Sequence, residues 1–352
     1  MQVKNLMPDM IILDLARSKA AGLETCRILR NHGHFKTLPI IVSTPSNSPE
    51  YRAQIYDAGA TDIFPVPVSE KEVQNRVHMY LNYRKAMTGL QQYHARMARE
   101  LKLARAMQDA LLPPLSQLEQ IAKSHQLAFA CRSESSEEMG GDFWGIDVLD
   151  ADRLFIYITD FSGHGLSASL NTFRLHSLIS HDQITARETM TSPADYLEKL
   201  NRDLFNLLPT EQYATMLCGI IDLKKNVFTY AAAASTAPVK MTIGVRATQS
   251  LDPSGFPLGM IEEARYDVRQ VPFKKGEILF FYSDVLTESQ DHQGRMIGEE
   301  KFLELCQAAN MRPDNAQNVT GQVFLDGFME DFNSRVPRPL LDDLTAVTVT
   351  RL

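Results

Sequence analysis

Short apolar runs alternate with amphipathic stretches through the first part of the chain. The runs predict strands and the stretches predict helices, because apolar residues recur with the periods of those two structures. In order along the chain, these segments are residues 10–13, 22–31, 38–42, 49–58 and 63–68. Strands that alternate with helices favour a parallel α/β sheet, whose chemistry gathers at the carboxyl ends of its strands. Asp14 and Thr44 fall at two of these ends.

A long helix is predicted for residues 69–112. The stretch has Gly89 as its only glycine, it has no proline, and the pair Pro113-Pro114 follows it. Mostly apolar residues recur along this stretch in alternating steps of three and four, with two polar breaks. This seam favours a coiled coil and a homodimer through residues 69–112. The seam consists of Met87, Leu90, His94, Met97, Leu101, Ala104, Gln108 and Leu111. The alternative is an amphipathic helix packed on its own domain.

Beyond the helix, β-rich apolar runs alternate with helical stretches, which favours an α/β sandwich. The runs are residues 127–131, 154–158, 216–221, 227–232, 278–282 and 346–349. We therefore expect a partial α/β domain at residues 1–85, the helical linker at 69–112 and a sandwich domain at 113–352.

Aspartates stand at the ends of several predicted strands of the sandwich. Asp142 follows two glycines, Asp160 follows the run LFIYIT, Asp284 follows ILFFYS, and Asp342-Asp343 precedes LTAVTVT. A single aspartate at such a place is usually a turn residue or a helix cap. Four of them favour a cluster for hard divalent cations, which take several oxygen ligands.

Composition and charge narrow the functional classes. The 352 residues are 44% hydrophobic and 22% charged, as in a soluble globular protein, and the formal net charge of −7 offers no basic surface for nucleic acid or an anionic membrane. The first apolar run is too short to span a bilayer, so we expect a cytoplasmic protein. The four cysteines are far apart in the sequence and lack a zinc spacing, so buried free thiols are expected.

Six motifs in order resemble those of the metal-dependent (PPM), type 2C-like serine/threonine phosphatases, in the SpoIIE/RsbU branch of bacterial regulators. They are QDALLPP, GGDFW, DFSGHG, FPLG, FFYSDVLTES and DDLTAVTV, and the resemblance runs from about residue 107 to residue 352. It implies two packed β-sheets flanked by helices, with two Mn²⁺ or Mg²⁺ ions between the sheets. Catalysis in this family uses a water that bridges the two cations and attacks phosphorus in line.

The resemblance implies roles for particular residues. Asp142 and Asp160 would bind at the shared centre, together with the backbone carbonyl of Phe161, and Asp284 and Asp342 would complete one metal's ligands. These four aspartates are thus the expected catalytic residues.

Further residues are expected to support these ligands. They are Asp343, Gly141, Gly163 and His164. His164 would have a structural role beside the glycine turn, with proton donation to the leaving group as the alternative.

Two segments depart from the phosphatase pattern. Residues 232–236 read AAAST where the branch often has Asn-Ala-Gly-His, and Val285 stands where a glycine is expected after the third-motif aspartate. Both departures lie near the expected metal site, and neither removes a carboxylate.

Residues 7 to 85 resemble the second half of a response-regulator receiver domain. Asp14 would be the phospho-acceptor and Thr44 the switch hydroxyl. The family's first two strands, with the acidic pair that binds Mg²⁺, are expected ahead of Met1, and Val66-Pro67 stands where Lys-Pro is usual. The strand that ends at Asp14 should therefore have an exposed apolar edge.

The leading hypothesis is hydrolysis of phosphoserine or phosphothreonine on a regulatory protein, by resemblance a phosphorylated anti-sigma-factor antagonist of the STAS type. A sensor kinase would act on the receiver. The alternatives are a pseudophosphatase adaptor that binds a partner-switching protein without turnover, and an oligomerising scaffold. Retention of all four carboxylates favours the enzyme, because an adaptor does not need so much like charge held together.

Overall fold

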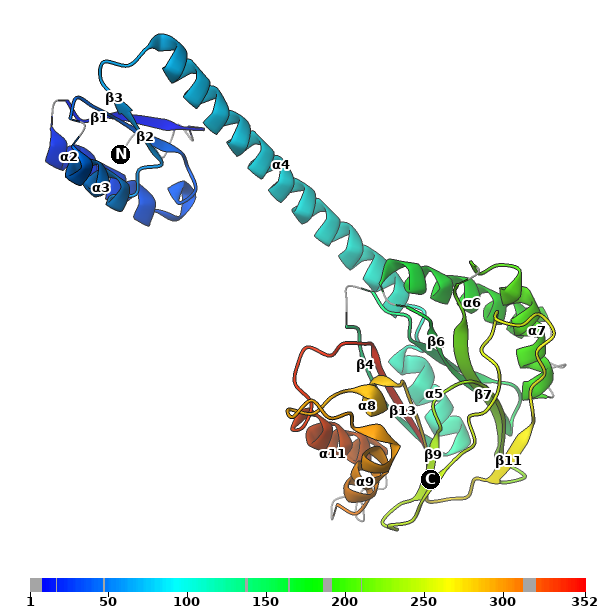
Figure 1. Cartoon of the computed structure of the whole chain (residues 1–352). Coiled ribbons are helices and arrows are strands. Elements are labelled where there is room, and N and C mark those ends of the chain that lie inside the picture. The colour runs from blue at the N-terminus through cyan, green and yellow to red at the C-terminus, as the bar shows by residue number, and fades with distance from the viewer. Residues whose placement is uncertain are drawn as a thin grey trace. The chain divides into compact units, whose positions relative to one another are not determined.

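The computed structural model describes residues 8–16, 18–46, 48–136, 139–163, 165–185, 192–209, 211–312 and 321–352 (Figure 1). The chain divides into two compact units between Glu100 and Leu101. No helix within the described ranges combines the length and the apolar character needed to cross a bilayer.

The first unit contains a parallel three-stranded sheet in the order β1-β2-β3. Its elements are β1 (Ile11–Asp14), α2 (Lys19–Asn31), η1 (Gly33–Phe35), β2 (Ile40–Thr44), α3 (Pro49–Asp57), β3 (Asp62–Pro65) and the start of α4 (Glu70–Asp109). Ser18 and Ser48 begin α2 and α3, since each side chain accepts a hydrogen bond from a first-turn amide. The α/β class and the order of these elements are as predicted.

Strand β1 forms an edge of this sheet, as expected. Its residues alternate between partly buried and exposed, and Ile12 is 49% exposed. The central strand β2 is almost wholly buried, because helices and neighbouring strands cover it.

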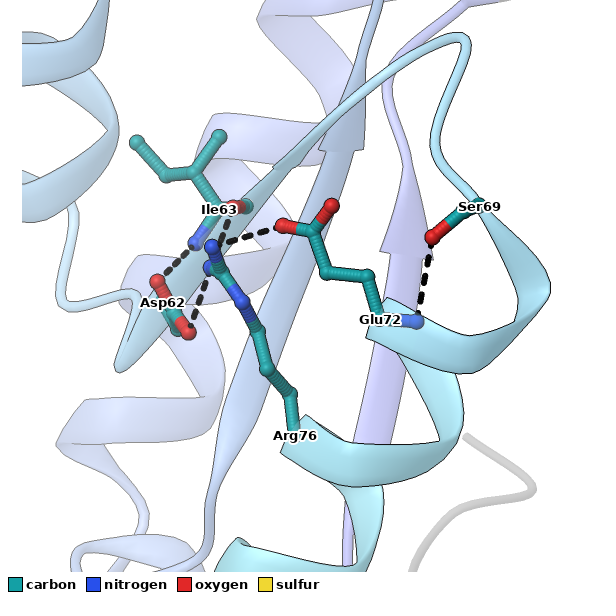
Figure 2. A network of polar contacts seen from close by, with 5 residues as sticks. All are labelled: Asp62, Ile63, Ser69, Glu72 and Arg76. Carbon is teal, nitrogen blue, oxygen red and sulfur yellow. Dashed lines mark hydrogen bonds and ion pairs between the residues drawn. The ribbon is translucent and has the colours of Figure 1, made fainter.

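Helix α4 is tied to β3 within the first unit by Arg76 (Figure 2). Its guanidinium donates to the Asp62 carboxylate at 3.0 Å, to the Ile63 carbonyl at 3.2 Å and to Glu72 at 2.8 Å. Ser69 caps the helix, since its hydroxyl accepts from the amide of Glu72. The helix begins one residue later and ends three residues earlier than the predicted stretch.

The second unit contains two antiparallel five-stranded sheets. Their orders are β10-β9-β12-β13-β4 and β11-β8-β7-β6-β5. The strands are β4 (Leu127–Glu134), β5 (Phe143–Val148), β6 (Arg153–Phe161), β7 (Ala214–Asp222), β8 (Val227–Ala233), β9 (Val239–Thr242), β10 (Thr248–Ser250), β11 (Arg269–Pro272), β12 (Glu277–Tyr282) and β13 (Leu344–Arg351). The helices are α5 (Leu115–His125), α6 (Leu166–Thr185), α7 (Pro193–Phe205), α8 (Val285–Glu288), α9 (Gly298–Asn310) and α11 (Gly321–Asn333).

Three apolar clusters make this unit a layered sandwich. The central cluster lies between the sheets and includes Trp144, Leu217, Phe281 and Val347. A second cluster joins the β12 sheet to α9 and α11, and a third joins the β7 sheet to α6 and α7. The predicted α/β sandwich is therefore present, and Trp144 is a core residue.

The cysteine prediction was wrong at one position. Cys26, Cys218 and Cys306 are buried free thiols, but Cys131 is exposed. Cys131 lies on β4, which is the edge strand of its sheet.

The coiled-coil seam was also wrong at its carboxyl end. Gln108 is buried in the second unit, where its side chain hydrogen-bonds to Gly140 and Thr172. Leu111 packs against the core beneath α6 and α7. The end of the predicted seam therefore belongs to the sandwich unit, as the alternative reading of the helix proposed.

Candidate metal centre

The end of one sheet positions Asp142 and Asp160. Strands β5 and β6 are antiparallel, with Phe143 opposite Thr159, so the two aspartates stand at neighbouring strand ends. A Cβ atom on Gly141 would lie 3.0 Å from the Phe161 carbonyl oxygen and 3.1 Å from Oδ1 of Asp160. Glycine at this position therefore lets the Asp142 loop approach both of these oxygens closely.

The other sheet positions Asp284 and Asp342. Strands β12 and β13 pair with Tyr282 opposite Ala346, and the Ser283 amide donates to the Thr345 carbonyl at 2.8 Å. Asp284 directly follows β12 and Asp342 lies just before β13, so this pairing brings both to the same end of the sheet.

Asp343 joins the two sets of aspartates. Its buried carboxylate accepts from the Gly141 amide at 2.7 Å, and from the amide and hydroxyl of Ser136 at 2.8 and 3.1 Å. A side chain on Gly140 would collide with this carboxylate. Both carboxylate oxygens of Asp343 therefore accept hydrogen bonds from the segment that leads to Asp142.

A pocket of about 250 Å³ opens where these strand ends meet. Among the described residues its lining contains Asp142, Asp160, Asp284, Glu288 and Glu299, and contains no lysine, arginine or histidine. The sequence prediction did not include the two glutamates. The sequence could have indicated Glu288, because it lies one helical turn after Asp284 and so on the same side of the helix.

Burial and like charge raise the pKa values of these carboxyl groups. Desolvation raises the pKa of Asp160 to about 8, and the charges of Asp284, Asp342 and Asp343 add to the effect. The pKa of Asp284 rises to about 6, again chiefly by desolvation and then through Asp342 and Glu288. Without cations, this end of the sandwich favours protonated carboxyls.

Asp142 is the most deeply placed member of the cluster. Desolvation is the main cause that raises its pKa well above the usual range, followed by the charges of Asp160 and Asp343. Hydrogen bonds from Thr345 and Ser283 act in the opposite direction. Its Oδ2 atom is buried and has no hydrogen-bond partner. Its described charged neighbours in the pocket are other carboxylates rather than basic side chains. Such an oxygen fits a metal ligand.

The carboxylates converge without forming a finished coordination shell. In the described part of the chain, no three His, Cys, Asp or Glu side chains already stand around one point as metal ligands. The shared pocket and the mutual effects on pKa show that the carboxylates lie near one another. To bind cations, these side chains must move closer together.

Gln108 of α4 holds the loop that precedes Asp142. Its amide nitrogen donates to the Gly140 carbonyl at 2.7 Å and to the Thr172 hydroxyl at 3.1 Å, and its Oε1 accepts from the Gly140 amide at 3.3 Å. The sequence prediction missed this contact, although a glutamine on an otherwise apolar seam was a signal of it.

Ala234, Ser235 and Thr236 of the departing segment 232–236 line the pocket. Ala234 has φ of 53°, in the left-handed region that favours glycine. The hydroxyl of Thr236 donates to the Tyr282 carbonyl. Val285, the second departure, is buried in the core against α9 and α11.

The remaining predicted residues lie elsewhere. Gly163 adopts φ of 84° in the turn after β6, and His164 lies outside the described residues. Asp14 and Thr44 belong to the first unit, at the ends of the paired strands β1 and β2. Asp14 is exposed and accepts from the Ala16 amide at 3.0 Å, whereas Thr44 is fully buried.

Comparison with known protein families identifies the second unit. Residues 150–352, more than half of the chain, match the family described as Stage II sporulation protein E (SpoIIE). The chain belongs to the SpoIIE family. Residues 1–78 of this SpoIIE-family protein match the response regulator receiver domain, as the sequence pattern predicted.

Two curated relatives come from Bacillus subtilis (strain 168). The phosphoserine phosphatase RsbU is 24% identical over 302 residues, which cover 85% of this chain and 83% of RsbU. The phosphoserine phosphatase RsbP is 28% identical over 200 residues, or 55% of this chain, and the chain spans about half of its length, 46%.

A solved structure supports the fold of this SpoIIE-family chain. The SiaA-PP2C domain of Pseudomonas aeruginosa superposes with a TM-score of 0.61 at 19% sequence identity, covering 73% of this chain and 97% of that domain. The sandwich therefore has the PP2C fold, as predicted from the six motifs.

Proposed function

We propose that this chain is a receiver-linked, metal-dependent serine/threonine protein phosphatase. It would hydrolyse phosphoserine or phosphothreonine on a regulatory protein. The observation that carries the proposal is the convergence of aspartates from two sheets on one pocket whose described lining has no basic side chain. A phosphate dianion cannot bind such a pocket unless cations offset the carboxylates.

Two Mn²⁺ or Mg²⁺ ions would be held by Asp142, Asp160, Asp284 and Asp342, with the backbone carbonyl of Phe161. When bound, the cations supply Lewis acidity and make water a stronger nucleophile at neutral pH. The chain's own groups prepare for this. Asp343 and Gln108 fix the loop that carries Asp142 through bonds to Gly141 and Gly140.

Proton release is part of cation binding in this proposal. Asp160, whose pKa lies at about 8, must lose its proton before it can act as a ligand at neutral pH. The pocket, whose lining includes residues 234–237, would orient the phosphorylated residue for in-line attack.

The names of RsbU and RsbP support phosphoserine as the scissile group. We extend the proposal to a phosphorylated anti-sigma-factor antagonist of the STAS type as partner, in the cytoplasm. A sensor kinase would phosphorylate the receiver at Asp14, with Thr44 on the neighbouring strand as the switch residue. Support comes from the match of residues 1–78 to receiver domains.

A pseudophosphatase adaptor is the second candidate. It is favoured by the absence, among the described side chains, of three potential ligands already grouped for a metal. In that case the chain would bind a partner-switching protein without turnover.

Phosphate release in Mn²⁺ separates the two candidates. We expect the purified chain to release phosphate from a phosphoserine peptide and Asp160→Asn to abolish this release, because the variant removes a central ligand. The matched control is Asp326→Asn, an exposed carboxylate on α11 outside the pocket. Equal rates with EDTA and with Mn²⁺, or an active Asp160→Asn variant, would refute the metal-dependent mechanism.

A further inference from the structure

A second hollow lies beside the metal pocket, on the segment that joins α8 to α9. This hairpin, residues 289–297, is closed by bonds from the Ile297 amide to the Ser289 carbonyl and from the Asp291 amide to the Arg295 carbonyl, at 2.9 and 2.8 Å. Its tip is tied to the turn after α11, since the His292 amide donates to the Arg335 carbonyl at 3.2 Å. The α8, α9 and α11 helices lie together over one sheet (Figure 1).

The hollow has a volume of about 590 Å³ and a basic lining. Arg295, Lys301 and Arg335 line it together with His292, and Asp291 is its only acidic residue among those described. This balance contrasts with the chain's net charge of −7.

The single carboxylate is already occupied within the hairpin. Asp291 accepts from the amides of Gln293 and Arg295 at 2.8 and 3.0 Å, and from the Arg295 guanidinium at 2.9 Å. These bonds from Arg295 and Gln293 hold the pKa of Asp291 below its usual value. Its charge therefore stabilises the turn and offsets the charge of Arg295. No other described acidic residue of the lining offsets the remaining positive charges of the hollow.

Arg335 is the cation that is available to a ligand. Within the described ranges no hydrogen bond or ion pair engages its guanidinium, and the residue is exposed. The hydrogen bond from Lys301 is the main cause that lowers the pKa of Glu304, and the charge of Arg335 adds to this effect without a direct contact. Lys301 is partly used, because it pairs with Glu304 at 2.5 Å on the outer face of α9. Met296, which is 62% exposed, adds an apolar surface beside these charges.

The two hollows share one segment and have opposite charge. Glu288 and Glu299, at the two ends of the hairpin, line the metal pocket, whereas Arg295 and Met296 line the basic hollow. The hairpin therefore connects the two hollows, so a partner whose phosphorylated residue enters the metal pocket can also reach the basic hollow.

We propose that the basic hollow formed by residues 291–297, Lys301 and Arg335 is a docking site for an acidic segment of the phosphoprotein partner. The proposal rests on the proposed function, because it assigns the hollow to that partner. An acidic partner would meet general repulsion from a chain of net charge −7, and a local basic site beside the pocket gives it orientation and specificity. Arg335 offers a planar, bidentate donor for carboxylates.

The test uses the full chain and labelled synthetic peptides. Each carries a phosphoserine, then a Gly/Ser spacer of about six to twelve residues, which reaches ~20–40 Å when extended, then a run of glutamates or of glutamines. Fluorescence anisotropy measures binding, and phosphate release in Mn²⁺ measures turnover. We expect about fivefold tighter binding of the glutamate peptide at low salt, and loss of this preference at high salt.

Variants locate the effect. Arg335→Gln should abolish the glutamate preference and Arg335→Glu should reverse it, while turnover of p-nitrophenyl phosphate stays unchanged. The matched control is Arg246→Gln, another exposed arginine without a described partner, outside the hollow, which should keep the preference. Equal binding of both peptides at every spacer length, or an equal loss in Arg246→Gln, would overturn the docking site.

Binding and turnover also separate this proposal from the phosphatase itself. A chain that prefers the glutamate peptide but releases no phosphate from any substrate retains the docking site and loses the enzymatic function. A chain that releases phosphate from both peptides at equal rates, with equal affinities, retains the enzyme and loses the docking site.

Discussion

The chemistry of single residues in this chain is governed by carboxylates placed where water cannot solvate them. Asp142, Asp160 and Asp284 each have a raised pKa, with desolvation as the largest cause. A raised pKa in an acidic group means that the folded chain binds protons that the unfolded chain has already released.

Metal-free protein should therefore lose stability as the pH rises. Asp160 and Asp284, with pKa values of about 8 and about 6, contribute stability that is present below the unfolded pKa and is lost as the pH passes through these values. Thermal unfolding in EDTA should show a lower Tm at pH 8 than at about pH 5. Added Mn²⁺ should raise the Tm most at the higher pH, where cations and protons compete least. A Tm in EDTA that rises steadily over this interval would contradict the assignment.

Ala234 offers a test of backbone strain at the pocket wall. Its φ of 53° is unfavourable for a residue with a Cβ atom, so Ala234→Gly should stabilise the fold by roughly 1 kcal/mol. The neighbour Ala233 is fully buried in β8, and Ala233→Gly should destabilise the fold because it removes a packed methyl group from a strand. Urea unfolding of both variants gives the two signs, and a destabilised Ala234→Gly would refute the strain.

Among the elements, β6, β12 and β13, which adjoin Asp160, Asp284 and Asp342, were foreseen, whereas β5 beside Asp142 and the short peripheral strands were not. Strands β6, β7, β12 and β13 are buried on both faces, so their sequences are continuous apolar runs that predict strands. Strands such as β10 and β11 carry polar residues on an open edge, and their sequences lack that signal.

Asp160, Asp284 and Asp342 could be proposed from the sequence because each adjoins a foreseen apolar strand, whereas Asp142 was proposed from the two glycines before it. The sequence also favoured a cluster of these aspartates, but their arrangement within it could not be derived, because it depends on the packing of two sheets whose ends meet in space. Gln108 illustrates the limit, because only the folded chain shows that a helix predicted as a linker ends against Gly140.

The carboxyl end of α4 should matter for both stability and activity. Gln108→Ala leaves the buried amide and carbonyl of Gly140 without their partner, which should cost about 1–3 kcal/mol and lower the rate of phosphate release. Gln92→Ala, on an exposed turn of the same helix, is the matched control and should change neither quantity. Denaturant unfolding and the Mn²⁺ assay measure the two effects, and wild-type behaviour of Gln108→Ala would exclude a role for the contact.

At the scale of the whole molecule, the middle of α4 leaves apolar side chains uncovered. Leu90 is 49% exposed and Met87 is 40% exposed, and both lie on the predicted seam. A second copy of the chain would cover them, which supports a homodimer through the part of residues 69–112 that precedes Gln108.

Sedimentation analysis tests this assembly. The full chain should sediment as a dimer, and the double variant Leu90→Glu with Met97→Glu should sediment as a monomer, because charges at seam positions are desolvated in a coiled coil. Leu103→Glu is the control, since Leu103 is 68% exposed and lies off the seam. A monomeric wild-type chain, or dissociation by Leu103→Glu alone, would contradict the assignment.

The place of β13 in its sheet has a consequence for biosynthesis. This strand, made of residues 344–351, lies between β12 and β4, and Asp342 and Asp343 stand at its start. While the ribosome is still producing residues before 342, the sheet lacks an inner strand and the loop of Gly141 lacks its carboxylate anchor. On the proposed function, a nascent chain would therefore gain phosphatase activity only after translation has passed β13.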